Sequence, residues 1–353
     1  LLLFSSLPNK EELQLFEKML TEFRSLPKSF VRDMIMKAPG RDVMNILSRC
    51  VLALYTYDDD PDNISTENVL RQCLHLIAAF PMLAVYSYQS YQHFHCGQSL
   101  VIHRPEKGLS TAENTLRMLR ITGEYTPLEA KLLDLALGLH AEHGGGNNST
   151  FTTRVMSSAD TDPYSVYAAA ICSLKGKKHG GANHQVRAMQ ADIKQHVSNW
   201  EDDDEVADYL AKIVNRQAYD KSGLVYGMGH AVYTLSDPRA IICKKYAKKL
   251  AEGTEFEAEY RLLESIERLA PEVILRERGT KKDMCANIDM YSGFVYSMMG
   301  IPEDLYTPLF ACARMAGWAA HRFEEIVAGK RIIRPAYKST RSGSRPYTPI
   351  SER

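Results

Sequence analysis

The sequence predicts an all-α fold. Hydrophobic residues recur with the 3.6-residue period of an α-helix along most of the 353 residues, and convincing alternating strand patterns are scarce. Asp162-Pro163 and Asp237-Pro238 each have the form of a helix N-cap followed by proline in the first turn. A chain of this length can bury a large core, either in two domains or in one large lobed domain.

The periodic segments predict helices in order along the chain. The first, 10–23, follows Pro8-Asn9 and carries its apolar residues on one face. Further helices are predicted over 28–37, 41–56, 66–80, 83–93, 111–120, 127–140, 163–174, 184–197, 204–217, 238–252, 255–269, 285–299 and 305–328. The only candidate strands lie near 101–103 and 330–333, and the tail 337–353 is predicted to be an extended arm or disordered.

The composition argues against several classes of function. Lys+Arg and Asp+Glu both number 43, and this zero net charge argues against a general nucleic-acid binder. The seven cysteines include no CxxC pair, which argues against a disulfide framework or structural zinc and favours the cytoplasm. No apolar run reaches the roughly 20 residues of a membrane span, and Leu1–Phe4 lacks the form of a signal peptide. These four residues read like the end of an apolar helix, so we expect the natural chain to begin earlier.

The first candidate site is HAEHGGGNNST at 140–150. His140 and His143 lie three residues apart at the end of a predicted helix. Two interpretations are open: the histidines complement the helix dipole before a glycine stop, or they bind a metal ion. HAE also opens the zinc-deaminase signature, but that signature needs a P-C-x-x-C partner, which this chain lacks.

A second candidate is SLKGKKHGGAN at 173–183. His179 stands where a helix ends, before two glycines that let backbone or a ligand approach closely. On this pattern alone the histidine is either structural or functional. The neighbouring lysines are either surface charge or a phosphate contact.

The stretch GLVYGMGHAVYTLSDPR at 223–239 places His230 on a glycine-rich turn and Arg239 in the first turn of a helix. Gly227-x-Gly229 is not a dinucleotide fingerprint, because the third glycine and a preceding βαβ strand are missing. Arginine in a first turn is slightly unfavourable for the helix dipole, a conflict of the kind expected where function overrides propensity. The stretch is therefore either a loop into a helix or half of a site for an anionic, carbonyl-bearing substrate.

The last candidates lie in NIDMYSG at 287–293 and in the helix and tail over 313–335. Asp289 stands in an apolar helical context, where desolvation would raise its pKa and make it a usable base. A buried structural aspartate is the alternative. Arg314 interrupts an apolar helix face and Arg334 follows the end of that helix, and each alone could be an ordinary ion-pair partner.

In this order, the stretches resemble the citrate synthase family. The resemblance runs from about residue 1 to 338, and G-x-G-H-x-V followed by D-P-R resembles the family's signature. It also includes LPNKEEL, H-x-x-H-G-G-x-N, the DPY…HGGAN segment, N-I-D-x-Y-S-G and R-x-x-G-W…R-P. Each fragment alone is weak, and five of them in one order argue strongly against coincidence.

The resemblance implies a tricarboxylic acid cycle enzyme that condenses acetyl-CoA with oxaloacetate and hydrolyses the thioester to citrate and CoA. It implies that His179 hydrogen-bonds the thioester carbonyl, that Asp289 removes the acetyl methyl proton, and that His230 donates to the oxaloacetate carbonyl. Four further residues are implied to bind oxaloacetate: His143, Arg239, Arg314 and Arg334. The last of these would come from the other subunit of a homodimer. Arginine suits this role because it binds carboxylates bidentately and stays charged.

The implied fold has a large helical domain, 1–180 and 301–353, and a smaller helical domain, 181–300, that closes over the site. No cofactor and no metal are implied, since the CoA thioester is a substrate. Neither nucleic acid nor a membrane is an expected partner, and the expected location is the cytoplasm.

Two points stay open at this stage. The family often has a basic residue four positions after the signature histidine, and here that position is Thr234. The residues that bind the CoA phosphates are therefore unknown, with four lysines as candidates: Lys177, Lys178, Lys281 and Lys282. The alternatives for function are 2-methylcitrate synthase, which uses propionyl-CoA, and, more remotely, a metal-dependent hydrolase that uses His140 and His143.

Overall fold

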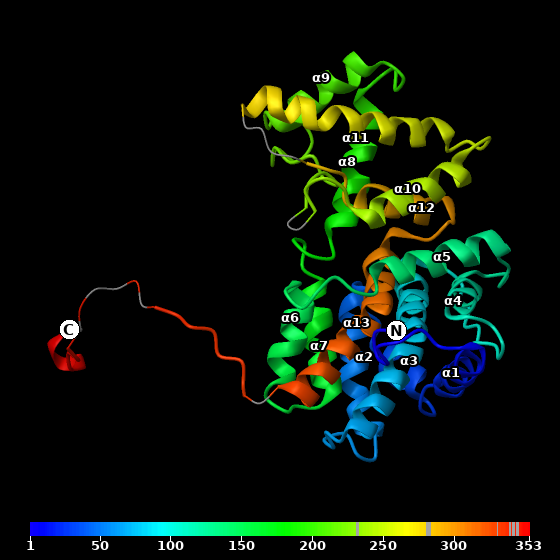
Figure 1. The fold of residues 1–353 in the computed structure, drawn as a ribbon, viewed down its shortest axis with the longest axis vertical. Coiled ribbons are helices and arrows are strands. Elements are labelled where there is room, and N and C mark those ends of the chain that lie inside the picture. The colour runs from blue at the N-terminus through cyan, green and yellow to red at the C-terminus, as the bar shows by residue number, and fades with distance from the viewer. Residues whose placement is uncertain (231–232, 280–283, 330, 339, 341–342, 344–345) are drawn as a thin grey trace.

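The computed structural model shows an all-α protein with two groups of helices (Figure 1). The structure describes residues 1–353 except 231–232, 280–283, 330, 339, 341–342 and 344–345. Over these described ranges the only β pairing is an isolated antiparallel bridge between Met228 and Ala286. The predicted fold class is therefore confirmed.

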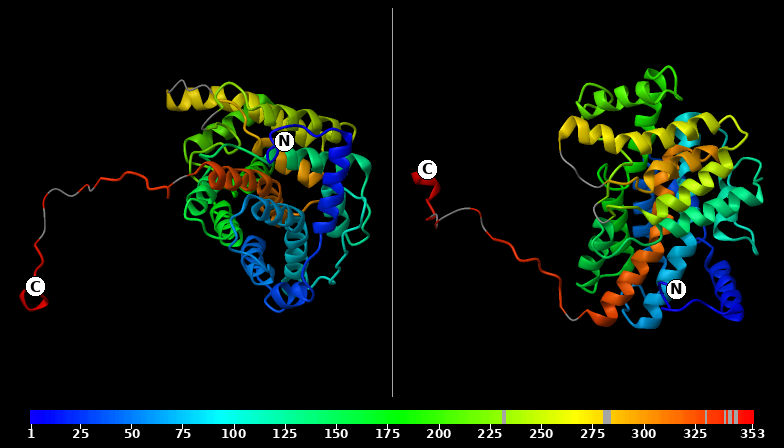
Figure 2. Two further views of the ribbon diagram at one scale, coloured as in Figure 1. Left: turned by 60° about the horizontal axis from the view of Figure 1, so that its bottom comes forward. Right: turned by 45° about the horizontal axis from the view of Figure 1, so that its top comes forward.

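Each group is built from helices that pack against one another (Figures 1 and 2). The lower group in Figure 1 contains α1 (Lys10–Phe23), α2 (Val43–Leu54), α3 (Thr66–Cys96), α4 (Thr111–Leu119), α5 (Pro127–His140), α6 (Asn148–Ser157), α7 (Pro163–Leu174) and α13 (Tyr306–Ala328). The upper group contains α8 (Ala182–His196), α9 (Asp203–Val214), α10 (Pro238–Ala251), α11 (Glu257–Arg278) and α12 (Asp289–Met298). Short 3-10 helices are η2 (Tyr55–Tyr57), η3 (Glu303–Leu305) and η4 (Ile350–Glu352).

The chain passes from one group to the other between α7 and α8 and returns between α12 and α13. In the lower group, α13 packs against α3, α5 and α6, and its Trp318 is completely buried. In the upper group, α11 packs against α9, and α10 packs against α12. The two crossings thus lie near the boundaries that the sequence predicts for the smaller domain, and they place the ends of several helices between the groups.

Helix α3 differs from the prediction because it is one continuous helix through Pro81. We predicted two helices, 66–80 and 83–93, since proline removes a backbone hydrogen bond and crowds the preceding turn. The residues around Pro81, from Ala78 to Val85, are all buried in the core. Apolar packing therefore compensates for the lost hydrogen bond. Helix α11 likewise runs through Pro271, beyond the predicted end at 269.

Three further differences concern local structure. Helix α6 is absent from the predictions because NSTFTTRVMS is rich in Ser and Thr, which are poor helix formers. Burial of Thr150 and Thr153 and packing against α7 and α13 stabilise it. The predicted helix 28–37 is a π-helix, η1, over Val31–Met36. The described residues near 101–103 and 331–333 are not strands.

Two segments bear on membranes and on assembly. By length and composition alone, α3 is long and apolar enough to cross a membrane. We had predicted no segment of this kind from the sequence. Because 78% of its most apolar window is buried inside the protein, it has the character of a core helix.

After α13 the chain extends away from both groups of helices and ends far from them (Figures 1 and 2).

Candidate active site

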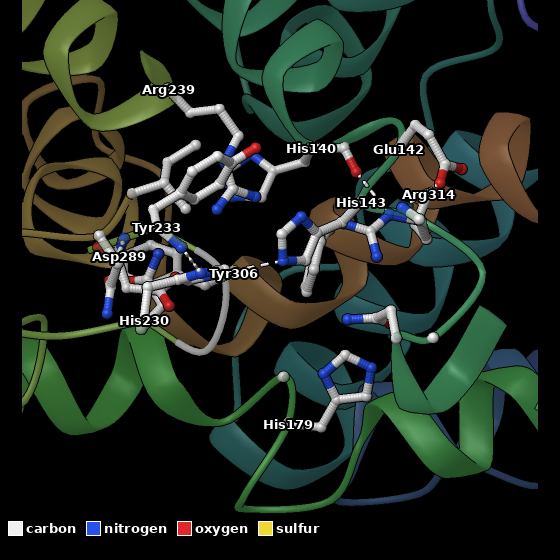
Figure 3. A pocket seen from close by; sticks show the side chains of 18 of the residues that line it. His140, Glu142, His143, His179, His230, Tyr233, Arg239, Asp289, Tyr306 and Arg314 are labelled. Atoms are coloured by element: carbon white, nitrogen blue, oxygen red, sulfur yellow. Dashed lines mark hydrogen bonds between the residues drawn. The ribbon is translucent and has the colours of Figure 1, made fainter. Parts of the chain in front are cut away.

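A cleft of about 910 Å³ lies between the two groups of helices (Figure 3). The lower group and its loops contribute His140, Glu142, His143, Gly144, Gly146, Asn147, His179, Gly180, Tyr306, Phe310 and Arg314. The upper group contributes Asn183, Gly229, His230, Tyr233, Arg239, Asn287, Ile288, Asp289 and Tyr296. Six of the seven residues predicted to act on substrate line this cleft: His143, His179, His230, Arg239, Asp289 and Arg314. The seventh, Arg334, is exposed on the segment after α13 and does not line it.

His140 and His143 occupy the end of α5 in different ways. His140 is the last residue of the helix and is buried, and its Nδ1 donates to the carbonyl of Ala136, 2.8 Å away. Burial lowers the pKa of His140 to about 4, and burial together with the charge of Arg239 does the same for His143. Both rings are therefore neutral near pH 7. In the part of the chain that the structure describes, no three His, Cys, Asp or Glu side chains are grouped to hold a metal ion, so the hydrolase alternative finds no support.

The loop before α10 carries His230 into the cleft. Gly227 and Gly229 have φ angles of +84° and +85°, which residues with a side chain rarely adopt. The carbonyl of Gly229 accepts a hydrogen bond from Asn287 Nδ2 at 2.9 Å, which joins the loop to the segment before α12. The glycines therefore allow the sharp path that brings His230 into the cleft that Asp289 also lines (Figure 3).

A hydrogen bond joins His230 to His143 across the cleft, with 3.1 Å between the two Nε2 atoms (Figure 3). The backbone N–H of Tyr233 donates to His230 Nδ1 at 3.1 Å. Since a backbone N–H only donates, Nδ1 of the neutral ring is an acceptor and the proton is on Nε2. Burial lowers the pKa of His230, which favours this neutral form. His230 therefore presents an N–H donor to the cleft.

His179 lies in the turn between α7 and α8, on the lower side of the cleft (Figure 3). A side chain on the next residue, Gly180, would come within 2.4 Å of the Leu174 carbonyl, so only glycine fits there. The backbone N–H of Ser149 donates to His179 Nε2 at 3.4 Å, and the Ser149 hydroxyl lies 2.9 Å from the same atom. The Nδ1 atom of the neutral ring therefore carries the proton. Burial lowers the pKa of His179 to about 4.

Asp289 is the first residue of α12, and it lines the cleft. Its backbone N–H donates to Asn287 Oδ1 at 3.0 Å, which fixes the start of the helix. The surrounding protein raises the pKa of Asp289 to about 6, chiefly through desolvation, while the charge of Arg239 opposes this shift. The carboxylate is thus a stronger base than an exposed aspartate and still ionised near neutral pH.

Two arginines complete the cleft, and protein groups hold the Nε atom of each. Arg239 donates from Nε and Nη2 to Asp237, whose side chain is fully buried, at 3.0 and 2.8 Å. Arg314 is fully buried, its Nε donates to the His140 carbonyl at 2.8 Å, and its guanidinium lies 4.7 Å from the Phe310 ring centre. Nη1 and Nη2 of Arg314 are buried and have no hydrogen-bond partner among the described residues. Burial lowers the pKa of Arg314 to about 10, so it stays charged at neutral pH.

Five residues in or next to the cleft were not singled out by the sequence. Tyr233 and Glu142 line the cleft, whereas Ser149, Trp318 and His321 lie outside its lining. Ser149 is buried and contacts His179, and Trp318 Nε1 donates to its hydroxyl at 3.3 Å. Tyr233 lies beside His230, and Glu142 Oε1 accepts from His321 at 3.0 Å. No periodicity marks these residues, although all except Trp318 and His321 stand within six positions of a predicted histidine.

The lysines predicted as CoA-phosphate contacts lie at two places in the chain. Lys177 and Lys178 are exposed just before His179 and do not line the cleft. Lys281 and Lys282 lie outside the described residues. Thr234 is exposed. These four lysines therefore remain candidates.

Comparisons with known proteins agree with this geometry. Residues 1–336 match the family model described as "Citrate synthase, C-terminal domain". A citrate synthase of Synechocystis sp. is 34% identical, over 100% of this chain and 82% of its own length. A 2-methylcitrate synthase of Corynebacterium glutamicum is 31% identical, over 100% of this chain and 86% of its own. The solved ternary complex of carboxymethyl coenzyme A and oxaloacetate with citrate synthase from Thermoplasma acidophilum has a TM-score of 0.82 and 25% identity, covering 100% of this chain and 87% of that one.

Proposed function

This chain belongs to the citrate synthase family, and from that membership together with its cleft we infer that it condenses acetyl-CoA with oxaloacetate and hydrolyses the thioester to citrate and CoA. It is thus an acyltransferase whose acyl group becomes an alkyl group on transfer. The observation that carries this function is the buried Arg314. Its two terminal nitrogens lack a described hydrogen-bond partner, although the charge of Glu142 acts on the guanidinium, and buried donors of this kind suit a carboxylate ligand.

We propose that oxaloacetate binds first, through its two carboxylates. Arg314 uses only Nε for a protein hydrogen bond, and both of its terminal nitrogens are left for the substrate. Arg239 gives Nε and one hydrogen of Nη2 to Asp237, so Nη1 and the second Nη2 hydrogen are left for a carboxylate. A guanidinium edge matches a carboxylate with two parallel hydrogen bonds. His143 holds the same substrate from the end of α5. The arginine charges also draw a dicarboxylate into the cleft although the whole chain has zero net charge.

We propose that Asp289 then removes a proton from the acetyl methyl group. A thioester α-proton is a very weak acid, so negative charge must be stabilised at the carbonyl oxygen as it develops. His179 Nδ1–H supplies this hydrogen bond, because Ser149 holds Nε2 as the acceptor. The desolvated Asp289, with its pKa raised to about 6, is ionised and basic enough to accept the proton.

Carbon–carbon bond formation follows at the carbonyl carbon of oxaloacetate. The Nε2–H of His230, which bonds His143 in the structure, turns to the substrate carbonyl oxygen and stabilises its developing charge. The enolate carbon attacks, the π electrons of the carbonyl move to its oxygen, and that oxygen takes the Nε2 proton of His230 to become the hydroxyl of citryl-CoA. The proton that Asp289 accepted replaces it when the site resets. Water then hydrolyses the thioester and releases citrate and CoA.

We propose that residues 181–300 move as a small domain against 1–180 and 301–353. Water has to be kept from acetyl-CoA until the new bond exists, and closure of the cleft provides this protection. The two chain crossings near these boundaries, with ligand-binding residues on both sides, support the proposal.

We further propose a cytoplasmic homodimer that works in the tricarboxylic acid cycle without a cofactor or a metal. Arg334 supports the dimer because it is exposed on a segment that leads away from its own cleft. It would complete the oxaloacetate site of the partner subunit. Neither nucleic acid nor a membrane is part of the proposal.

The acyl donor is proposed to be acetyl-CoA rather than propionyl-CoA. Tyr296, Tyr306 and Phe310 line the cleft, and the Phe310 ring centre lies 6.2 Å from that of His179. Such bulky rings favour the smaller donor. One extra methylene changes the specificity constant by roughly 10- to 200-fold. We therefore expect kcat/KM with acetyl-CoA to exceed that with propionyl-CoA by about 10-fold or more. A higher value with propionyl-CoA would identify the chain as a 2-methylcitrate synthase.

The rate should depend on the ionisation of Asp289. Desolvation raises the pKa of Asp289 to about 6, and only its ionised form accepts a proton. His179, with a pKa of about 4, is neutral through the same range. The plot of log kcat/KM for acetyl-CoA should thus be flat above about pH 7 and fall about 10-fold per pH unit below about pH 6. A profile that stays flat to about pH 5 would contradict the base assignment.

A further inference from the structure

We propose that Tyr233 is a positioning residue that holds the oxaloacetate half of the site in its working geometry. This inference rests on the proposed function and adds a residue to it. Tyr233 lines the cleft from the upper group of helices and lies between the loop with His230 and the start of α10.

The ring of Tyr233 contacts three side chains of the oxaloacetate half (Figure 3). Its centre lies 4.9 Å from that of His230, with 34° between the planes. It stacks against His143 with the centres 6.1 Å apart and 30° between the planes. The guanidinium carbon of Arg239 lies 5.5 Å from the ring centre. One aromatic side chain thus touches the carbonyl-polarising histidine, its hydrogen-bond partner and one arginine of the carboxylate clamp.

The backbone of Tyr233 is fixed as well. Its N–H donates to His230 Nδ1 at 3.1 Å, and its carbonyl accepts from Cys285 Sγ at 3.5 Å. Cys285 precedes the segment with Asn287 and Asp289. The backbone that carries the ring is therefore held on both sides and is tied directly to the His230 imidazole.

An aromatic ring suits the position of Tyr233 better than a polar or an aliphatic side chain. Its electron-rich face attracts the Arg239 cation, and its flat surface packs against imidazole rings without adding a charge. His143 belongs to the lower group of helices, whereas His230 and Arg239 belong to the upper group. Tyr233 is thus a contact through which the two sides of the cleft are aligned.

His179, in the acyl-CoA half of the site, is not among the described ring contacts of Tyr233, although Phe310 lies against both His179 and Arg314. His179 has its described ring contact with Phe310, at 6.2 Å, and its hydrogen bonds with Ser149. Removal of the Tyr233 ring should therefore affect oxaloacetate and leave the acyl donor largely unaffected. A general loss of stability would not divide the two substrates in this way.

The test compares Tyr233→Leu and Tyr233→Phe in the full chain by steady-state kinetics. Tyr233→Leu removes the ring and should raise the oxaloacetate KM by about 10-fold or more and lower kcat, with the acetyl-CoA KM changed by less than about 2-fold. Tyr233→Phe keeps the ring and should restore values close to the wild type. The matched control is Tyr246→Leu, which removes a half-buried ring under Lys249 on α10, away from the cleft, and should change neither KM.

Three outcomes would overturn the inference. These are an unchanged oxaloacetate KM in Tyr233→Leu, equal increases in both KM values, or a Tyr233→Phe variant as impaired as Tyr233→Leu. Should Tyr233→Leu fail to fold, Tyr233→Met replaces the ring with a flexible side chain of similar length and is judged by the same values. Failure of the proposed function is distinct, because the wild-type protein itself would then release no CoA in response to oxaloacetate.

Discussion

Asp289→Ala should lower kcat by about 10²- to 10⁴-fold while oxaloacetate still binds. The carboxylate is the only base that the account places at the acetyl methyl group, and its pKa is raised to about 6 because it is desolvated. Oxaloacetate instead depends on the arginines and on His143 and His230, which the substitution leaves in place. Steady-state kinetics give kcat, and calorimetric titration with oxaloacetate alone gives the dissociation constant.

Two further variants test whether the loss of kcat is due to the carboxylate of Asp289 itself. Asp289→Asn keeps the shape of the side chain without the base and should lose as much activity as Asp289→Ala. Asp192→Ala removes a carboxylate that bonds Tyr209 outside the cleft and should leave kcat unchanged. If Asp289→Ala turned over acetyl-CoA within a few-fold of the wild type, Asp289 would not be the base.

Arg239→Ala should raise the oxaloacetate KM by about 100-fold, equivalent to about 3 kcal/mol. The substitution removes one bidentate edge of the carboxylate clamp and leaves the buried Asp237 without its ion-pair partner. Although burial alone would raise the pKa of Asp237, the hydrogen bonds from Arg239 hold it below its usual value. The unpaired carboxylate would then repel an incoming dicarboxylate, which adds to the loss.

The clamp is tested further by Arg239→Lys and by a surface control. Lysine keeps the charge but not the planar fork, so the oxaloacetate KM should again rise, though less than with alanine. Arg268→Ala, on α11, breaks an exposed ion pair with Asp203 of α9 and should have no effect on either KM. An oxaloacetate KM in Arg239→Ala that equals the wild-type value would remove Arg239 from the clamp.

Most of the fold could be predicted from local sequence. The capped helices α5, α7 and α10 begin where Thr126, Asp162 and Asp237 precede a proline, since an N-cap and a first-turn proline act within a few residues. Continuity of α3 through Pro81 could not be predicted in this way. It depends on core packing from other helices, which outweighs the local cost of the proline.

The residues of the site could likewise be predicted from local sequence, but their contacts could not. His143, His179, His230, Arg239, Asp289 and Arg314 stand in short, distinctive stretches, and the cleft brings all six together. Their pairing could not be read from the sequence. The His143–His230 hydrogen bond joins residues 87 positions apart, and the Ser149 contact with His179 spans 30. Arg334 is a different case, because its proposed place is in a second subunit.

The residues of this cleft are proposed to form a carbon–carbon bond between acetyl-CoA and oxaloacetate. The most direct test is the release of free CoA thiol from acetyl-CoA by the purified protein, measured with and without oxaloacetate. Thiol release is expected only when oxaloacetate is present, with one citrate formed for each thiol. Thiol release at the same rate without oxaloacetate, or none with both substrates, would contradict it.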